Sequence, residues 1–162
     1  MGTVEATLNR ARTRKPGGAR GRPSPKLSAA QLRDLLDRAL SKVDGDEVAG
    51  SLLRAAGLRI RFRFPDLDLV LNVASSDDRD RHLRWTFSDP PAWEPKLDLV
   101  MDSQVANAYL QGRQSLAIAI ARRRVRCSGE TRSALIYVPA LRLVADAYRR
   151  IVYEEYPQLE LG

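Results

Sequence analysis

Few residues in this chain combine the types and the spacing that chemistry requires. Asp77, Asp78, Asp80 and His82 lie close together, and clustered carboxylates beside a histidine can hold a metal ion or exchange protons. Their spacing lacks the glycine and the terminal glutamate of a calcium-binding loop. His82 is the only histidine, which excludes histidine-based triads and metal sites with several histidines. We therefore predict a solvated loop here and no metal site.

The remaining candidates for catalysis also have simpler interpretations. Glu154 and Glu155 fall on a predicted helix, where a solvated face explains them. Cys127 is the only cysteine, so neither an intrachain disulfide nor a thiolate metal cluster can form, and we expect it to face the core from a strand. The chain has no Gly-x-Ser-x-Gly elbow, no P-loop and no Gly-x-Gly-x-x-Gly. The sequence therefore predicts a protein that is not an enzyme and that uses no cofactor.

One short motif near the N-terminus points to binding. Arg20, Gly21, Arg22 and Pro23 equal the core of an AT-hook, in which an extended Arg-Gly-Arg enters the narrow minor groove of A·T-rich DNA. The same charges could instead contact nucleic acid without specificity, contact anionic lipid headgroups, or serve only as a solvated tail. The motif leaves these alternatives open.

Composition separates this N-terminal segment from the rest of the chain. The 162 residues carry a net charge of +7, and residues 1–26 hold seven basic residues against one acidic residue, so most of the excess lies there. Those residues are rich in Arg, Gly, Pro and Ser and cannot bury enough apolar surface to offset the entropy of ordering. We predict a disordered basic tail over 1–26 and one folded domain over 27–162. No apolar run approaches the ~18 residues of a membrane span, and no secretory signal is evident, so we expect a cytoplasmic protein.

The spacing of apolar residues predicts the elements of the first half of the domain. They are two helices, over 28–43 and 46–56, and three strands, over 58–64, 67–73 and 82–88. Ser28 and Gln31 form a capping box, and Gly57 ends the second helix. The strands alternate apolar and polar residues and are joined by short turns, so we expect them to be antiparallel.

The second half predicts a crossover and a long helix. A strand over 96–102 leads to a helix that Asp102 or Ser103 caps and Gly112 ends, then to a short apolar helix over 116–121 and a strand over 122–127. The connection of about twenty residues permits a parallel pair of strands. Pro139 fits the first turn of the final helix. Together the elements predict an α+β fold, with a five-stranded, mostly antiparallel sheet covered on one face by helices.

The motifs of the crossover follow one another in a specific order. The series begins with a strand that ends in Met and leads into an Asp-led helix, Leu99-Val100-Met101-Asp102, and that helix carries an aromatic–Leu pair, Tyr109-Leu110. A Gly with a basic residue follows, Gly112-Arg113, and then a short apolar helix, Ala119-Ile120-Ala121. The series ends with a strand of alternating basic and apolar residues, Arg124-Val125-Arg126-Cys127, and a final Gly129. This series resembles the signature of the sterol carrier protein type 2 family of lipid-binding domains. The chain departs from that family at Arg122 and Arg123, where the family usually has a small residue and Gly, and at Ile120 and Ala121, where it often has aromatic residues.

The resemblance implies a hydrophobic tunnel between sheet and helices that binds a sterol, a fatty acyl chain or another lipid without changing it. The wall residues expected on this basis are Met101, Tyr109, Leu110, Leu116, Ile118, Ile120, Val125, Leu135, Ile136, Val138, Leu141 and Val144. Two alternatives stay open. One is a DNA-associated protein that uses its AT-hook-like tail, and the other is an accessory subunit that presents a lipid or quinone to an enzyme partner.

Overall fold

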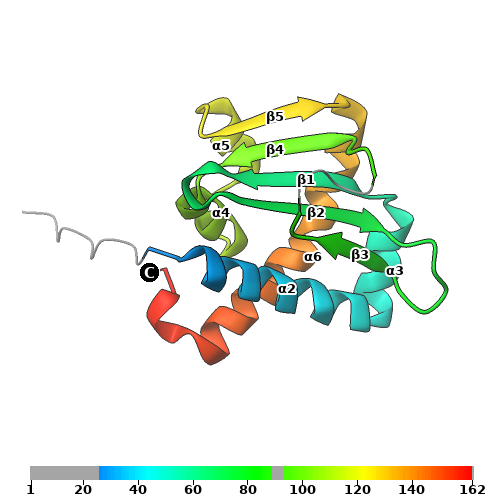
Figure 1. Cartoon of the computed structure of the whole chain (residues 1–162), viewed down its shortest axis with the longest axis horizontal. Coiled ribbons are helices and arrows are strands. Elements are labelled where there is room, and N and C mark those ends of the chain that lie inside the picture. The colour runs from blue at the N-terminus through cyan, green and yellow to red at the C-terminus, as the bar shows by residue number, and fades with distance from the viewer. Residues whose placement is uncertain (1–25, 89–92, 162) are drawn as a thin grey trace, which may run out of the picture.

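The computed structural model describes residues 26–88 and 93–161, which form one sheet and a layer of helices (Figure 1). The predicted tail lies outside these residues except for Lys26, and so does the motif at residues 20–23. The elements in chain order are α2 (Ala29–Gly45), α3 (Glu47–Ala55), β1 (Arg59–Phe64), the 3₁₀ turn η1 (Pro65–Leu67), β2 (Leu69–Ser75), β3 (Leu83–Thr86), β4 (Leu97–Met101), α4 (Ser103–Leu110), α5 (Leu116–Ala121), β5 (Val125–Gly129), α6 (Thr131–Glu155) and η2 (Pro157–Leu159).

The strands are arranged in the order β3-β2-β1-β4-β5. The pairs β1–β2 and β2–β3 are antiparallel, as the short turns predicted. The one parallel pair is β1–β4, while β4 and β5 are antiparallel, so the parallel pair that the crossover permitted does not form between its own two strands. The segment with α4 and α5 leaves the sheet after Met101 and returns beside it, because Val125 at the start of β5 pairs with Met101. The five-stranded, mostly antiparallel sheet is confirmed.

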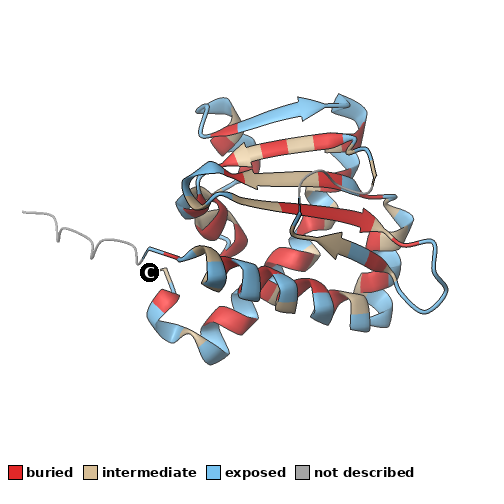
Figure 2. Cartoon of the chain, in the orientation of Figure 1, coloured by how far each residue is buried: buried red, intermediate tan, exposed pale blue. Residues whose placement is uncertain are grey.

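The two faces of the sheet differ as the alternation of residues predicts. On β1, Ile60 and Phe64 are buried under the helices, whereas Arg59, Arg61 and Arg63 lie on the opposite face. On that opposite face Asp98 of β4 accepts hydrogen bonds from Arg61 Nε and Nη2 at 3.0 and 2.7 Å. Figure 2 shows the buried residues following the strands and the inner sides of α2 and α6. The helices therefore cover one face, and the three arginines of β1 lie on the other.

Helix α6 begins at Thr131, eight residues before Pro139. The prediction that Pro139 lies in the first turn of this helix is therefore wrong. Proline has no N–H and cannot bond the carbonyl four residues before it, which here belongs to Leu135. Both Leu135 and Pro139 are exposed, so water can reach that carbonyl. The helix therefore continues through the proline, and residues 131–138 form a first third that the periodicity did not reveal.

Two helix ends share one hydrogen-bond pattern with different residues. After α4, Arg113 N–H bonds Ala108 O and Gly112 N–H bonds Tyr109 O; Gly112 has a φ of 75°. After α5, Arg124 N–H bonds Ala119 O and Arg123 N–H bonds Ile120 O. Both are Schellman motifs, whose left-handed position usually holds glycine. In the second motif that position is Arg123, with a φ of 59°.

This second turn also shortens the last strand, because residues 122–124 belong to the turn and β5 begins at Val125. The prediction that Cys127 faces the core is wrong about its burial. Cys127 is exposed, because β5 is the outermost strand and only its first residue is buried (Figure 2). Partial burial, and then the charge of Asp98, raise the pKa of its thiol, which disfavours the reactive thiolate.

Candidate ligand cavity

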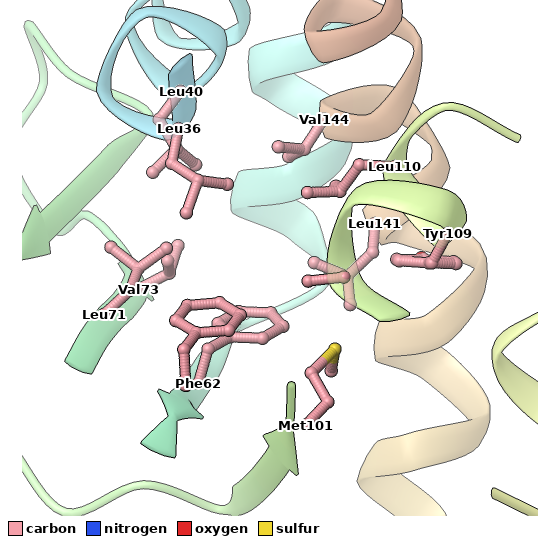
Figure 3. Close-up of a pocket in the computed structure, with 12 residues that line it drawn as sticks. Leu36, Leu40, Phe62, Leu71, Val73, Met101, Tyr109, Leu110, Leu141 and Val144 are labelled. Carbon is pink, nitrogen blue, oxygen red and sulfur yellow. The ribbon is translucent and has the colours of Figure 1, made fainter. Parts of the chain in front are cut away.

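A small hollow lies between the sheet and the helices. Twelve side chains from α2, β1, β2, β4, α4 and α6 line it: Leu36, Leu40, Phe62, Phe64, Leu71, Val73, Met101, Ala106, Tyr109, Leu110, Leu141 and Val144 (Figure 3). Its volume is about 30 Å³, which is on the order of one water molecule. Apart from the Tyr109 hydroxyl, these side chains offer no polar group. The hollow therefore suits a hydrocarbon and no ion.

Strand alternation and helical spacing explain why these side chains meet. Phe62 and Phe64 of β1 point to the helix side and pair with Leu71 and Leu69 of β2. On α6, Leu141 and Val144 are three residues apart and share the inner side of the helix. Helix α4 contributes the neighbours Tyr109 and Leu110, whose side chains lie toward α6 (Figure 3). The cavity thus has a sheet wall and a helix wall.

The expected wall residues fall into four groups. Met101, Tyr109, Leu110, Leu141 and Val144 line the cavity. Leu116 and Val138 line a separate surface groove between the α4–α5 turn and α6. Val125, the first residue of β5, is buried and Ile120 is half-buried, whereas Ile118, Leu135 and Ile136 are exposed. The structure thus brings five of the twelve together.

Seven lining residues were not anticipated: Leu36, Leu40, Phe62, Phe64, Leu71, Val73 and Ala106. The sheet residues among them carried a usable signal, because they occupy the apolar positions of two predicted strands. The signature of residues 97–129 drew attention to one side of the cavity only. A ligand between sheet and helices must contact both sides.

Tyr109 stands between the cavity and the surface groove, since it lines both. The groove measures about 490 Å³ and is also lined by Arg113, Ala117 and Arg142. The Tyr109 hydroxyl is buried and makes no hydrogen bond to any described residue. Burial raises the pKa of Tyr109 to about 12, against a smaller lowering by Arg142. Tyr109 therefore holds an unsatisfied polar group at the only place where cavity and groove share a side chain among the described residues.

A buried polar network holds α4 beside the cavity. Tyr148 Oη of α6 donates to Asn107 Oδ1 at 2.9 Å, and Gln111 Nε2 donates to the same oxygen at 2.8 Å. Gln111 also donates to Leu159 O at 3.0 Å and accepts from Leu161 N–H at 2.8 Å. The network ties α4 to α6 and to the segment after it. Burial raises the pKa of Tyr148 well above its usual range, so its hydroxyl stays a donor.

The start of α4 is fixed by a residue far away in sequence. Asp102 occupies the N-cap position, but its side chain makes no capping hydrogen bond. Instead Asp66 of η1 accepts from Ser103 N–H at 2.9 Å and from Ser103 Oγ at 2.5 Å. The prediction that Asp102 or Ser103 caps this helix is therefore corrected, because the capping carboxylate comes from the turn between β1 and β2.

Within residues 26–88 and 93–161, no group of three or more His, Cys, Asp or Glu side chains is placed to hold a metal ion. No helix in that part of the chain is long and apolar enough to cross a membrane.

Comparison with known proteins identifies the fold. The chain matches no protein-family model and no curated protein sequence. Among solved structures it is similar to sterol carrier protein domain 2 of Helicoverpa armigera, with a TM-score of 0.56 and 11% identity over 80% of this chain and 96% of that one. It is also similar to sterol carrier protein 2 from Yarrowia lipolytica, with a TM-score of 0.51 and 8% identity over 73% of this chain and 89% of that one. The chain has the sterol carrier protein 2 fold.

The same search also matched a much longer enzyme. The chain spans only 14% of the sec-alkylsulfatase Pisa1 from Pseudomonas sp., and 56% of this chain aligns with it at a TM-score of 0.47 and 11% identity. That match is too weak to bear on activity.

Proposed function

We propose that this protein is a non-enzymatic carrier that binds a hydrophobic ligand between its sheet and its helices. The observation that carries the proposal is the hollow between sheet and helices, which both layers line with apolar side chains. Burying a hydrocarbon there would be favourable by about 25 cal/mol per Å² of apolar surface. The similarity of the fold to proteins named sterol carriers supports a lipid as the ligand.

A ligand must enlarge the hollow. The present volume is about 30 Å³, whereas pockets for small molecules usually measure about 300–1,000 Å³. The helix wall is the side that can move, because α4 and α6 are held by side chains while the strands are joined by main-chain hydrogen bonds. Displacing Tyr109 would join the hollow to the groove beside it, which adds about 490 Å³. We infer that the ligand enters between α4, α5 and α6.

Native mass spectrometry of freshly purified protein tests the proposal, together with titration of a fluorescent fatty acid. We expect a bound mass in the lipid range, or saturable uptake with one site per chain. A protein that carries no ligand and takes up neither a fluorescent fatty acid nor a fluorescent sterol would contradict the proposal.

Variants connect uptake to the hollow. Val144→Phe fills the space without adding charge, and we expect affinity to fall at least about tenfold at a modest loss of stability. Leu110→Asp places a charge in the helix wall and should abolish uptake. Leu135→Asp is the matched control, because Leu135 is 74% exposed and lies outside the cavity. Uptake that survives Val144→Phe unchanged in a folded protein would place the ligand elsewhere.

We further propose that residues 27–162 act as one ligand-binding unit, since both walls of the cavity belong to them. The DNA-associated role rests on residues 20–23, which lie outside the described part of the chain, and it stays a prediction. The accessory role with an enzyme partner and the cytoplasmic location stay predictions as well.

A further inference from the structure

The segment from α4 through β5 has an unusual charge. Residues 103–129 contain no aspartate or glutamate, and they contain five arginines: Arg113, Arg122, Arg123, Arg124 and Arg126. All five are exposed, and none forms an ion pair within the described residues. The sequence departs from its family resemblance in this same segment, at Arg122 and Arg123. The fold therefore presents a concentrated positive charge with no internal partner.

An exposed apolar surface lies between these arginines. Helix α5 is entirely apolar, and its Ile118 is 49% exposed, while Ala117 and Ala121 are exposed beside it. Arg113 precedes the helix and Arg122 follows it directly. Apolar side chains bordered by long basic ones are typical of segments that lie in a membrane interface, where the arginines reach the phosphates. Figure 2 shows most of β5 as exposed, while α5 exposes only its outer side because Leu116 and Ala119 are buried.

Arg123 adds an independent observation. It occupies the left-handed position of a Schellman motif, a position that Gly112 fills at the end of α4. Glycine adopts this conformation without steric cost, whereas arginine does not. The side chain of Arg123 is exposed and makes no ion pair within the described chain, so folding does not explain its presence. A strained residue without a structural role suggests a functional one.

The position of α5 also suits the proposed path of the ligand. Leu116 and Ala117 line the groove between the α4–α5 turn and α6, and Ile118 follows them on the exposed surface. Tyr109 separates that groove from the internal cavity. If α5 lay on a bilayer, the groove would open toward the lipid. A hydrophobic ligand could then enter without crossing water.

We propose that α5 and the five flanking arginines are a docking surface for an anionic phospholipid bilayer. The direction of ligand transfer rests on the proposed function, but the docking itself does not. Each arginine near an anionic surface contributes enough to change affinity about fivefold, and Ile118 adds a contribution that salt does not screen. Zwitterionic bilayers should bind much more weakly.

Vesicle co-sedimentation of the full chain tests the docking surface. We expect binding to vesicles of phosphatidylcholine with about one-fifth phosphatidylserine and little binding to phosphatidylcholine alone. Arg122→Gln with Arg124→Gln should weaken binding about 25-fold, from two contributions of about fivefold. Arg79→Gln with Arg150→Gln is the matched control, because both are exposed arginines outside the segment. Because the tail is present throughout, equal binding by both pairs would assign the interaction to residues 1–26 and overturn the proposal.

Two further variants separate docking from general attraction to polyanions. Ile118→Asn should remove the binding that persists at high salt, whereas Val48→Asn on α3, which is 73% exposed, should not. Arg123→Gly should weaken vesicle binding about fivefold while raising the thermal midpoint, because it removes charge and strain together.

A DNA duplex added as a competitor tests the alternative partner. If the duplex displaces the protein from the vesicles, and the arginine variants lose DNA binding but not vesicle binding, the surface is a nucleic-acid site and the proposal fails. Fatty acid uptake measured without vesicles should be the same in these variants as in the wild type. If the wild type itself took up no fatty acid, that result would contradict the carrier function and not the docking surface.

Discussion

The sheet wall and the helix wall of the cavity present similar side chains but hold them by different means. Phe62 and Phe64 stand on β1, which is hydrogen-bonded to β2 along six residue pairs and to β4 on its other side. Leu110 and Leu141 stand on α4 and α6, and no backbone hydrogen bond joins these two helices in the described chain. Packing and the Asn107 network join them, while the Asp66 cap ties α4 to the turn between β1 and β2. This difference supports our proposal that a ligand displaces the helix wall.

The largest expected effect is a loss of stability when a side chain is removed from the sheet wall. Phe64→Ala removes a ring that is 2% exposed, and we expect a loss of about 3–5 kcal/mol in the free energy of unfolding. Leu110→Ala in the helix wall should cost less, about 2 kcal/mol, because α4 can shift to fill the space. Urea denaturation measures both. Equal losses would mean that the two walls are equally rigid.

An intermediate effect concerns the cap of the helix wall. Asp66→Ala leaves Ser103 N–H and Oγ without their acceptor, and we expect a loss of about 1–2 kcal/mol. Since the start of α4 is released, exchange of a bound fluorescent ligand should also become faster in stopped-flow measurements. Asp102→Ala is the matched control, because Asp102 occupies the N-cap position but its side chain makes no capping hydrogen bond. If both variants exchanged ligand at the wild-type rate, α4 would not be the moving part.

The smallest expected effect concerns one atom of the helix wall, the hydroxyl oxygen of Tyr109. Tyr109→Phe removes a buried hydroxyl that has no described partner, and we expect a gain of about 1 kcal/mol in stability. The pKa of Tyr109 is about 12 in the folded protein, above its ordinary value near 10, so the unfolded chain loses this proton first as pH rises. Wild-type stability should therefore fall between about pH 10 and 12, and the variant should lose less over that range. Identical alkaline unfolding curves would show that the hydroxyl is not buried in solution.

The features that depend on neighbouring residues were predicted from the sequence. The capping box of Ser28 and Gln31 is observed, and the alternation over residues 58–64 forms β1 with its arginines on the outer face. Spacing along the chain reports such local patterns directly. The antiparallel pairing of the first three strands followed from the short turns between them.

The features that were missed depend on residues far apart in the chain. Asp66 caps a helix that begins 37 residues later, and no local pattern contains that pairing. The sheet side of the cavity was missed because apolar strand residues look the same whether they face a void or a packed core. Pro139 was read as a helix start, although its exposed position lets α6 continue through it. The left-handed conformation of Arg123 has no signal in a residue type that normally avoids it.

The placement of β1 at the centre of the sheet has a consequence for how the chain folds. β1 pairs with β2 through a short turn, but its other edge pairs with β4, which is distant in the sequence. Arg61 of β1 and its partner Asp98 of β4 are separated by 37 residues. The β1–β2 hairpin and the β4–α4–α5–β5 unit can each form from nearby residues. Joining them closes a long loop, which is the slow kind of step in proteins rich in distant contacts. We therefore expect the parallel β1–β4 pair to form late, and the cavity with it, since its lining comes from both units.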